Sequence, residues 1–183
     1  MKGNFKALTE NLDVSKLEQL DIRIKDNSEI LRELVIQVVN SYCEPLDKMM
    51  KNIDTSLRET TPTNEELDSM SLQLSSCLYF AGEGVEYIGL KEDVAKAFKM
   101  EKFNTAFAQA AGTINDKTSA AELKSQEEYV MHSIYECAYK ECKHKLDAGN
   151  EMLQSIKKVI SRRMTEMQLS RIDPNNRFSG GEF

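Results

Sequence analysis

The sequence predicts an all-α protein, built on a long antiparallel helical hairpin with a kinked N-terminal helix, and completed as a bundle or a symmetric oligomer. Three observations predict this class. The 183 residues include only three Pro and eight Gly and no Trp, so few residues interrupt a helix. Lys, Glu, Leu, Met and Ala, which favour helices, are abundant. Apolar residues also recur at intervals of three and four over long stretches.

The chain divides into three parts by pattern. Residues 1–26 are ambiguous, because Leu20, Ile22 and Ile24 alternate as in a strand whereas Leu17, Leu20 and Ile24 fit a helix. We therefore predict an N-terminal arm or short helix there. Residues 27–171 form the predicted helical body, and residues 172–183, which are small and polar, form a predicted flexible C-terminal tail.

The first long helix is predicted from Asn27 or Ser28 to about Arg58. One apolar stripe defines it, made of Ile30, Leu31, Leu34, Val35, Val38, Tyr42, Leu46, Met49, Ile53 and Leu57. Pro45 lies inside this stripe. Because proline removes a backbone donor and clashes with the preceding turn, the helix should be kinked or broken near Cys43 and Glu44.

The second helix is predicted to begin near Asn64, because Thr63 and Glu66 match a capping box. Its apolar stripe contains Leu67, Met70, Leu74, Leu78, Ala81, Val85 and Ile88. After Ile88 the predicted apolar face shifts slightly around the helix, in a slip of the periodicity, and continues through Val94, Phe98, Phe103 and Phe107. Gly82, Gly84 and Gly89 mark either a close approach of another helix or a bend. Residues 112–117 are predicted to form a loop.

The third helix is the best defined, and a capping box of Ser119 with Glu122 is predicted to open it. Its stripe contains Leu123, Val130, Ile134, Ala138, Cys142, Leu146, Gly149, Leu153, Ile156, Ile160, Met164 and Met167. Two helices of this length joined by a short loop should pack antiparallel. Residues 96–102 then lie opposite residues 128–134, and the first helix or further copies of the chain cover the remaining faces.

Several classes of protein are not expected. No apolar run approaches the roughly 20 residues of a bilayer span, and the first residues lack the apolar core of a signal peptide. We therefore expect a cytoplasmic protein that does not enter a membrane. Neither His132 nor His144 belongs to a catalytic motif, so we predict no enzymatic activity and no cofactor.

The four cysteines, Cys43, Cys77, Cys137 and Cys142, are predicted to be buried, reduced thiols. Cys137, Cys142 and His144 could also suggest zinc. On a helix, however, the five-residue spacing turns the two thiols apart and no fourth ligand is evident. We therefore predict no metal site.

Positive charge is concentrated near the end of the third helix. Residues 140–171 carry eight Lys or Arg and four Asp or Glu, whereas residues 1–139 carry 15 basic and 24 acidic side chains. The cleanest cationic cluster, which contains no acid, is made of Lys157, Lys158, Arg162 and Arg163. Two explanations stay open: a helix C-terminus favours cations through its dipole, and a basic segment in an acidic protein is typical of polyanion binding.

A second group of lysines lies on the second helix. Lys91, Lys96, Lys99 and Lys102 alternate with Phe98, Phe103 and Phe107. Such a group can bind single strands by neutralising phosphates and stacking on bases, although phenylalanines at this spacing are also typical of a core. In the predicted hairpin the two basic groups lie far apart.

Part of the chain resembles a known family. The residues that carry the resemblance, within 75–171, are Leu78-Tyr79, Lys91, Lys96 to Lys102, a loop after Gly112, and Tyr135 through Ile156-Lys157 to Ser161-Arg162-Arg163. This region is similar to bacteriophage recombination mediator proteins of the UvsY type. Those are small helical proteins that assemble into rings, bind single-stranded DNA and help to load a recombinase onto DNA coated by single-strand-binding protein. The chain differs by an additional N-terminal helix and an acidic balance.

The resemblance implies a phage-type accessory protein of DNA recombination or replication. It implies Lys96, Lys99 and Lys102 as strand contacts, Arg162 and Arg163 as secondary ones, and a recombinase or single-strand-binding protein as partner, in the host cytoplasm if phage-encoded. Two other functions stay open. One is a structural or adaptor protein that acts through protein contacts as a homo-oligomer. The other is a small inhibitor whose acidic residues 10–33 mimic nucleic acid.

Overall fold

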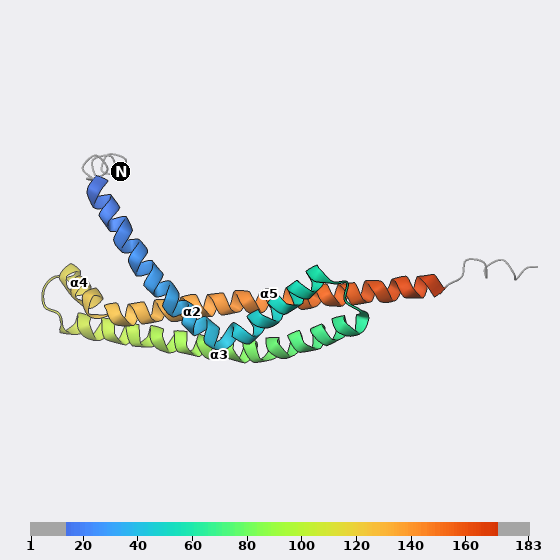
Figure 1. Cartoon of the computed structure of the whole chain (residues 1–183). Helices are drawn as coiled ribbons and strands as arrows, with labels where there is room; N and C mark the ends of the chain where they lie inside the picture. Colours follow the sequence, from blue (N-terminus) through green and yellow to red (C-terminus); the bar gives the residue numbers. More distant parts are fainter. Residues whose placement is uncertain (1–13, 172–183) are drawn as a thin grey trace, which may run out of the picture.

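A computed structural model describes residues 14–171, and within them every element is helical. Four helices follow one another: α2 (Val14–Glu59), α3 (Asn64–Gln109), α4 (Ile114–Lys124) and α5 (Gln126–Arg171). The all-α prediction is therefore confirmed for this part of the chain. The predicted tail at 172–183 and residues 1–13 of the predicted arm lie outside the described residues. Figure 1 shows α3 and α5 side by side along most of their length, with α2 crossing them.

The hairpin of α3 and α5 is the main body of the fold. Helix α3 begins where the sequence predicts it, at Asn64. The Thr63 hydroxyl accepts a hydrogen bond from the Glu66 backbone N–H at 3.3 Å, and the Glu66 carboxylate accepts one from the Thr63 N–H at 2.6 Å. The predicted capping box is thus confirmed. The glycines do not end α3. At Gly84 an added Cβ would lie 3.1 Å from Tyr42 of α2, so this glycine permits a close approach of two helices.

The segment between α3 and α5 differs from the prediction. A loop was expected through Lys117, with a helix opening at Ser119, but α4 already begins at Ile114. Thr113 caps it, because its hydroxyl accepts from the Asp116 N–H and the Asp116 carboxylate accepts from the Thr113 N–H. The predicted third helix is also two helices, since Ser125 interrupts it with φ −103° and ψ 13°. The real cap lies six residues earlier than the predicted one.

Helix α2 is longer than predicted and is kinked rather than broken. It begins at Val14, not near Asn27, and passes through Pro45 as one helix. Its path changes direction sharply in its light-blue to cyan part (Figure 1), which contains Pro45. Proline explains the bend, because it removes one helical hydrogen bond and pushes the preceding turn away. The expected boundary at residue 26 falls inside this continuous helix.

Two clusters of buried side chains form where α2 lies over the hairpin. The first joins α2, α3 and α5 near the middle of the hairpin and contains Val35, Val39, Cys43, Val85, Ile88, Ile134, Ala138 and Cys142. The second lies near the start of α3 and contains Leu46, Ile53, Leu67, Leu74, Leu78, Ala81, Leu153 and Ile156. An ion pair between Lys145 and Asp47 also ties α5 to α2. Together these contacts fix α2 on one side of the hairpin between about residues 35 and 53.

Several residues of the predicted stripes are exposed instead of buried. They are Ile30, Leu34, Leu57, Val94, Phe98, Leu123, Val130, Met164 and Met167. In α3 the predicted slip after Ile88 does not occur, because the inward face continues through the buried Ala95 and Ala106. Small alanines allow a close approach of α4 and α5 there, and the predicted Val94 and Phe98 consequently turn outward.

The capping box of α3 gives a first prediction. Replacing Thr63 by alanine should lower the free energy of unfolding by about 1 kcal/mol, because the Glu66 N–H loses its acceptor. Hydrogen bonds from the Thr63 N–H and hydroxyl hold the pKa of Glu66 below its ordinary value. The stabilisation by Glu66 is therefore present above its unfolded pKa of about 4.3 and is lost as the pH falls through the folded pKa.

Urea unfolding at neutral pH and at about pH 3 measures this contribution. Replacing Glu66 by alanine should destabilise the protein at neutral pH and have a much smaller effect in acid. Replacing the adjacent exposed Glu65 serves as the control for charge at the helix start. An equal effect of the Glu66 change at both pH values would show that the carboxylate does not cap the helix.

Candidate nucleic-acid interface

The far end of the hairpin brings the predicted lysines of α3 next to the start of α5. The Lys102 ammonium lies 3.6 Å from Glu128 Oε1, and His132 Nε2 lies 3.4 Å from Glu92 Oε1. These pairs confirm the predicted register, in which residues 96–102 lie opposite residues 128–134. The lysines therefore share this end with side chains of α5 that the sequence pattern did not single out.

An open cleft of about 500 Å³ lies on one side of this end. Its lining residues are Lys99, Met100, Phe103, Asn104, Glu122, Ser125, Gln126 and Tyr129. The Lys99 ammonium stands 4.3 Å from the centroid of the Tyr129 ring. This is a cation–π contact, and it holds the ammonium and an exposed aromatic face together. The cleft thus combines apolar walls, amide side chains and one cation.

The three predicted lysines do not form one row. Lys99 lines the cleft, and Lys96 is exposed and makes no ion pair or hydrogen bond within the described residues. Lys102 instead lines a separate hollow of about 370 Å³ together with Phe98 and Glu128. Phe103 and Phe107 are half-buried and stack on each other with their centroids 6.2 Å apart. Only Lys96 and Lys99 are therefore free to act together with the cleft.

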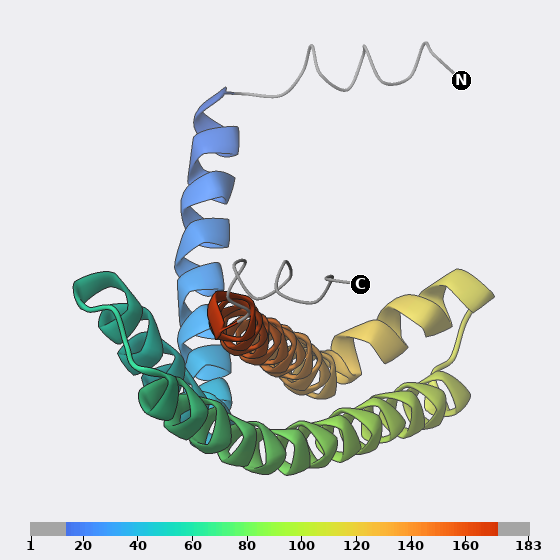
Figure 2. The same cartoon turned by 90° about the vertical axis from the view of Figure 1, so that its right-hand side faces the viewer.

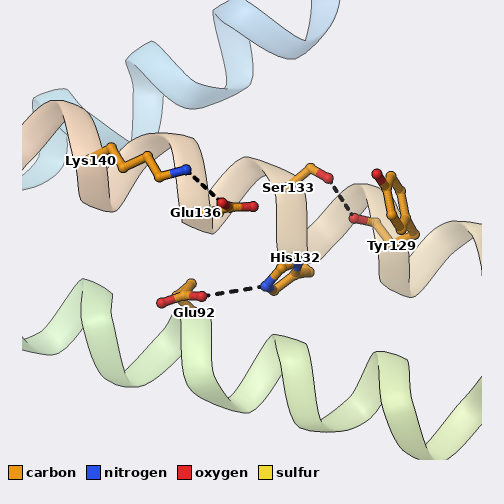
Figure 3. A network of polar contacts seen from close by, with 6 residues as sticks. All are labelled: Glu92, Tyr129, His132, Ser133, Glu136 and Lys140. Carbon is orange, nitrogen blue, oxygen red and sulfur yellow. Dashed lines mark hydrogen bonds and ion pairs between the residues drawn. The ribbon is translucent and has the colours of Figure 1, made fainter.

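One polar contact joins α3 and α5 beside the cleft (Figure 3). Glu92 of α3 points to His132 of α5, which is buried although it is polar. On the exposed surface of α5 itself, Lys140 donates to the Glu136 carboxylate at 2.6 Å. This hydrogen bond lowers the pKa of Glu136 and raises the pKa of Lys140. Sequence reasoning assigned inward positions to apolar residues, so it missed the buried His132 and its contact with Glu92.

The second predicted basic group lies at the opposite end of the hairpin and is partly engaged. Lys157 and Lys158 are exposed and make no ion pair within residues 14–171. Arg162 Nε instead donates to Glu166 Oε1 at 2.8 Å on its own helix. Arg163 is half-buried and donates to the Pro62 carbonyl at 2.6 Å, which ties α5 to the loop before α3. The structure thus leaves two of the four cations available, and it separates them from the cleft as predicted.

The cysteines only partly follow the prediction. Cys43 and Cys142 are buried and face each other between α2 and α5, and the pKa of Cys142 is raised by its hydrogen bond to Cys43 and by burial. Cys77 is half-buried and Cys137 is exposed, so the prediction of four buried thiols is wrong for these two. Within the described residues, no group of three or more His, Cys, Asp or Glu is arranged to hold a metal ion.

Comparisons with family models, curated proteins and solved structures give no match to this chain. Among the described helices, none combines the length and the hydropathy that crossing a membrane requires. The arrangement of side chains at the hairpin end is therefore the basis on which a function is proposed.

Proposed function

We propose that this protein is a non-enzymatic accessory protein of DNA recombination or replication that binds single-stranded DNA and a partner protein. The observation that carries the proposal is the Lys99–Tyr129 pair at the rim of an apolar cleft, with the unpaired Lys96 one turn away. Single-strand binders combine cations that follow the phosphates with aromatic faces on which bases stack. The resemblance to phage recombination mediators agrees with this chemistry.

The charges near the cleft set the expected strength of binding. Glu122 lines the cleft, and Glu101 and Glu127 are exposed on the helices that form it. These carboxylates repel phosphates, so affinity should be modest and should depend on stacking as much as on charge. Asn104 and Gln126 offer amide donors and acceptors to a base edge.

Replacing Tyr129 by alanine should weaken binding of a labelled oligothymidylate by about 5- to 150-fold, because loss of one stacked base costs about 1–3 kcal/mol. Replacing Lys99 by alanine should reduce the slope of log affinity against log salt by about 0.7, because one phosphate contact is lost. Fluorescence anisotropy at several salt concentrations measures both effects.

Lys143 offers a matched control, because its ammonium also stands near a tyrosine ring, that of Tyr139 at 5.9 Å, but outside the cleft. Replacing Lys143 by alanine should leave affinity and slope nearly unchanged. Equal losses for Lys99 and Lys143 would mean that only net charge matters and would exclude a site at the cleft.

The basic group at the other end suggests a second contact of the same kind. Replacing both Lys157 and Lys158 by glutamate tests this second DNA contact, because these two cations have no partner within residues 14–171. By resemblance, the partner protein is a recombinase or a single-strand-binding protein, and the place of action is the cytoplasm of the host cell if the protein is phage-encoded.

A second candidate function is that of a structural or adaptor protein that acts through protein contacts. The observation that favours it is uncovered apolar surface on α3, where Leu72, Tyr79 and Phe80 are exposed and the two rings meet edge to face with centroids 5.5 Å apart. Such surface is typical of a docking site for another protein. A defined complex that forms without any affinity for single-stranded DNA would favour this function over the first.

A further inference from the structure

Helix α2 leaves the hairpin part of the way along it. From Val35 to Ile53 it lies against α3 and α5 and contributes to both buried clusters. Before Val35, the half-buried Leu31 still packs against the first cluster, and the helix then runs away from the hairpin, as the blue part of the ribbon shows in Figures 1 and 2. We call residues 14–34 the arm. The contacts that α2 makes with α3 and α5 therefore stop while the hairpin continues.

The hairpin keeps an apolar groove beyond this point. Lys91 marks where α2 departs, because it donates to the Tyr42 hydroxyl at 3.1 Å and stands near the rings of Tyr87 and Tyr135. The same Lys91, Tyr87 and Tyr135 line the beginning of a groove of about 530 Å³. The groove also contains Leu90, Val94, Phe98 and Met131, all of them exposed. It is thus the continuation of the surface on which α2 packs.

The arm carries an apolar stripe that also continues the packed face of α2. Ile24, Leu31 and Leu34 precede Val35 and Val38 at helical spacing, so they lie on the same side of the helix. Ile24 is 64% exposed, and Leu34 is exposed as well. The described residues therefore include an apolar groove beside the surface on which α2 packs, and a piece of α2 whose apolar Ile24 and Leu34 are exposed.

The arm does not reach the groove of its own chain in this structure. Residues 14–44 contain neither Gly nor Pro, so no residue favours a kink where the arm leaves the hairpin. Pro45, the kink residue, lies on the packed side of that point, between Cys43 and Leu46 of the core. Within residues 14–171, no segment of the same chain therefore covers the exposed stripe of the arm or the groove.

We propose that the arm of one copy of this chain fills the groove of a second copy. The exchange is reciprocal, since each copy offers one arm and one groove, and two such contacts close a two-fold dimer. The groove also holds Glu128, whose Oε1 faces the Lys102 ammonium at 3.6 Å and whose Oε2 is buried without a hydrogen-bond partner within the described residues. An incoming arm brings Lys25 and Arg32 as donors for such a carboxylate. This proposal goes beyond DNA binding. It identifies the arm and the groove as the surfaces through which the predicted homo-oligomer forms.

Light scattering of the full-length chain over a range of concentrations tests the proposal, with no nucleic acid present. The wild-type chain should show a mass of at least twice the 20.8 kDa of one copy. Ile24→Asp on the arm and Val94→Asp in the groove should each weaken association about a hundredfold, because a charge is buried in an apolar contact. Both residues are more than half exposed in one copy, so circular dichroism should show unchanged helix content.

Ile22→Asp is the matched control, because Ile22 is 59% exposed but lies about 200° round the helix from Ile24. It should leave the mass unchanged. Mixing the Ile24→Asp and Val94→Asp chains should restore association in part, since the mixed pair keeps one intact arm and one intact groove. A monomer at all concentrations, an equal effect of Ile22→Asp and Ile24→Asp, or no recovery on mixing would each overturn the proposal. None of these results depends on DNA affinity. A negative result would therefore contradict the arm-to-groove dimer without contradicting the proposed binding of single-stranded DNA.

Discussion

Replacing Leu74 by alanine is expected to lower the free energy of unfolding by about 2–5 kcal/mol. Leu74 is 0% exposed and belongs to the buried cluster that joins α2, α3 and α5. Its removal leaves a cavity bordered by α2, α3 and α5, and a close-packed interior closes such a cavity only in part. Urea unfolding followed by circular dichroism measures the change.

Leu72 provides the control for this change, because it is the same residue type, two positions away on the same helix, and 75% exposed. Replacing Leu72 by alanine should cost about 0.5 kcal/mol or less. Similar losses at both positions would mean that Leu74 is not in the core, and the packing of α2 over the start of α3 would then be wrong.

The second large effect is expected at the contact between α2 and the middle of the hairpin. Val39 is 1% exposed and packs in the cluster with Ile88 and Ala138. Replacing Val39 by aspartate places a carboxyl there with no cationic partner in the cluster, and should cost about 3–5 kcal/mol. Because α2 carries the change, amide hydrogen exchange should show greater loss of protection in α2 than in α3 and α5.

The neighbouring Asn40 is exposed, so replacing it by aspartate adds the same charge to the same helix without burying it. That variant should change the unfolding free energy by about 0.5 kcal/mol or less. If the Val39 variant unfolds like wild type, or if its loss of protection is uniform over all helices, α2 does not pack on the hairpin through this face.

Local signals predicted α3 well. Thr63 and Glu66 form the expected cap, and Leu67 to Ile88 follow the expected inward face. These features depend on residues three or four apart, which a sequence pattern shows directly. The break at Ser125 was missed because no Gly or Pro marks it. The helix start at Ile114 was missed because Thr113 with Asp116 is an equally good cap, and the later Ser119 was chosen instead.

Contacts between distant segments limited the prediction of the candidate site. The hairpin register was predicted, and it correctly brought residues 96–102 opposite 128–134, but the sequence did not single out Tyr129 as the partner of Lys99. Arg163 was grouped with Lys157, Lys158 and Arg162 as one basic cluster, whereas it donates to the Pro62 carbonyl 101 positions away. No periodic pattern indicates a side chain that binds a backbone carbonyl in a distant loop.

The two ends of the hairpin have different roles in this arrangement. At one end, Arg163 and the capping box hold the loop between α2 and α3 in place. At the other end, α2 has already left, and the cleft and the groove lie on different sides of α3. A strand bound in the cleft and a second copy in the groove can therefore be accommodated together.

Binding of single-stranded DNA at the cleft is tested most directly by anisotropy titrations of a labelled oligothymidylate with the wild-type chain at several salt concentrations. Two phosphate contacts, by Lys96 and Lys99, predict a slope of log affinity against log salt of about −1.4. Binding at low salt with a slope near this value is the expected result. No binding at low salt, or a slope near zero, would contradict a nucleic-acid site at this end of the hairpin.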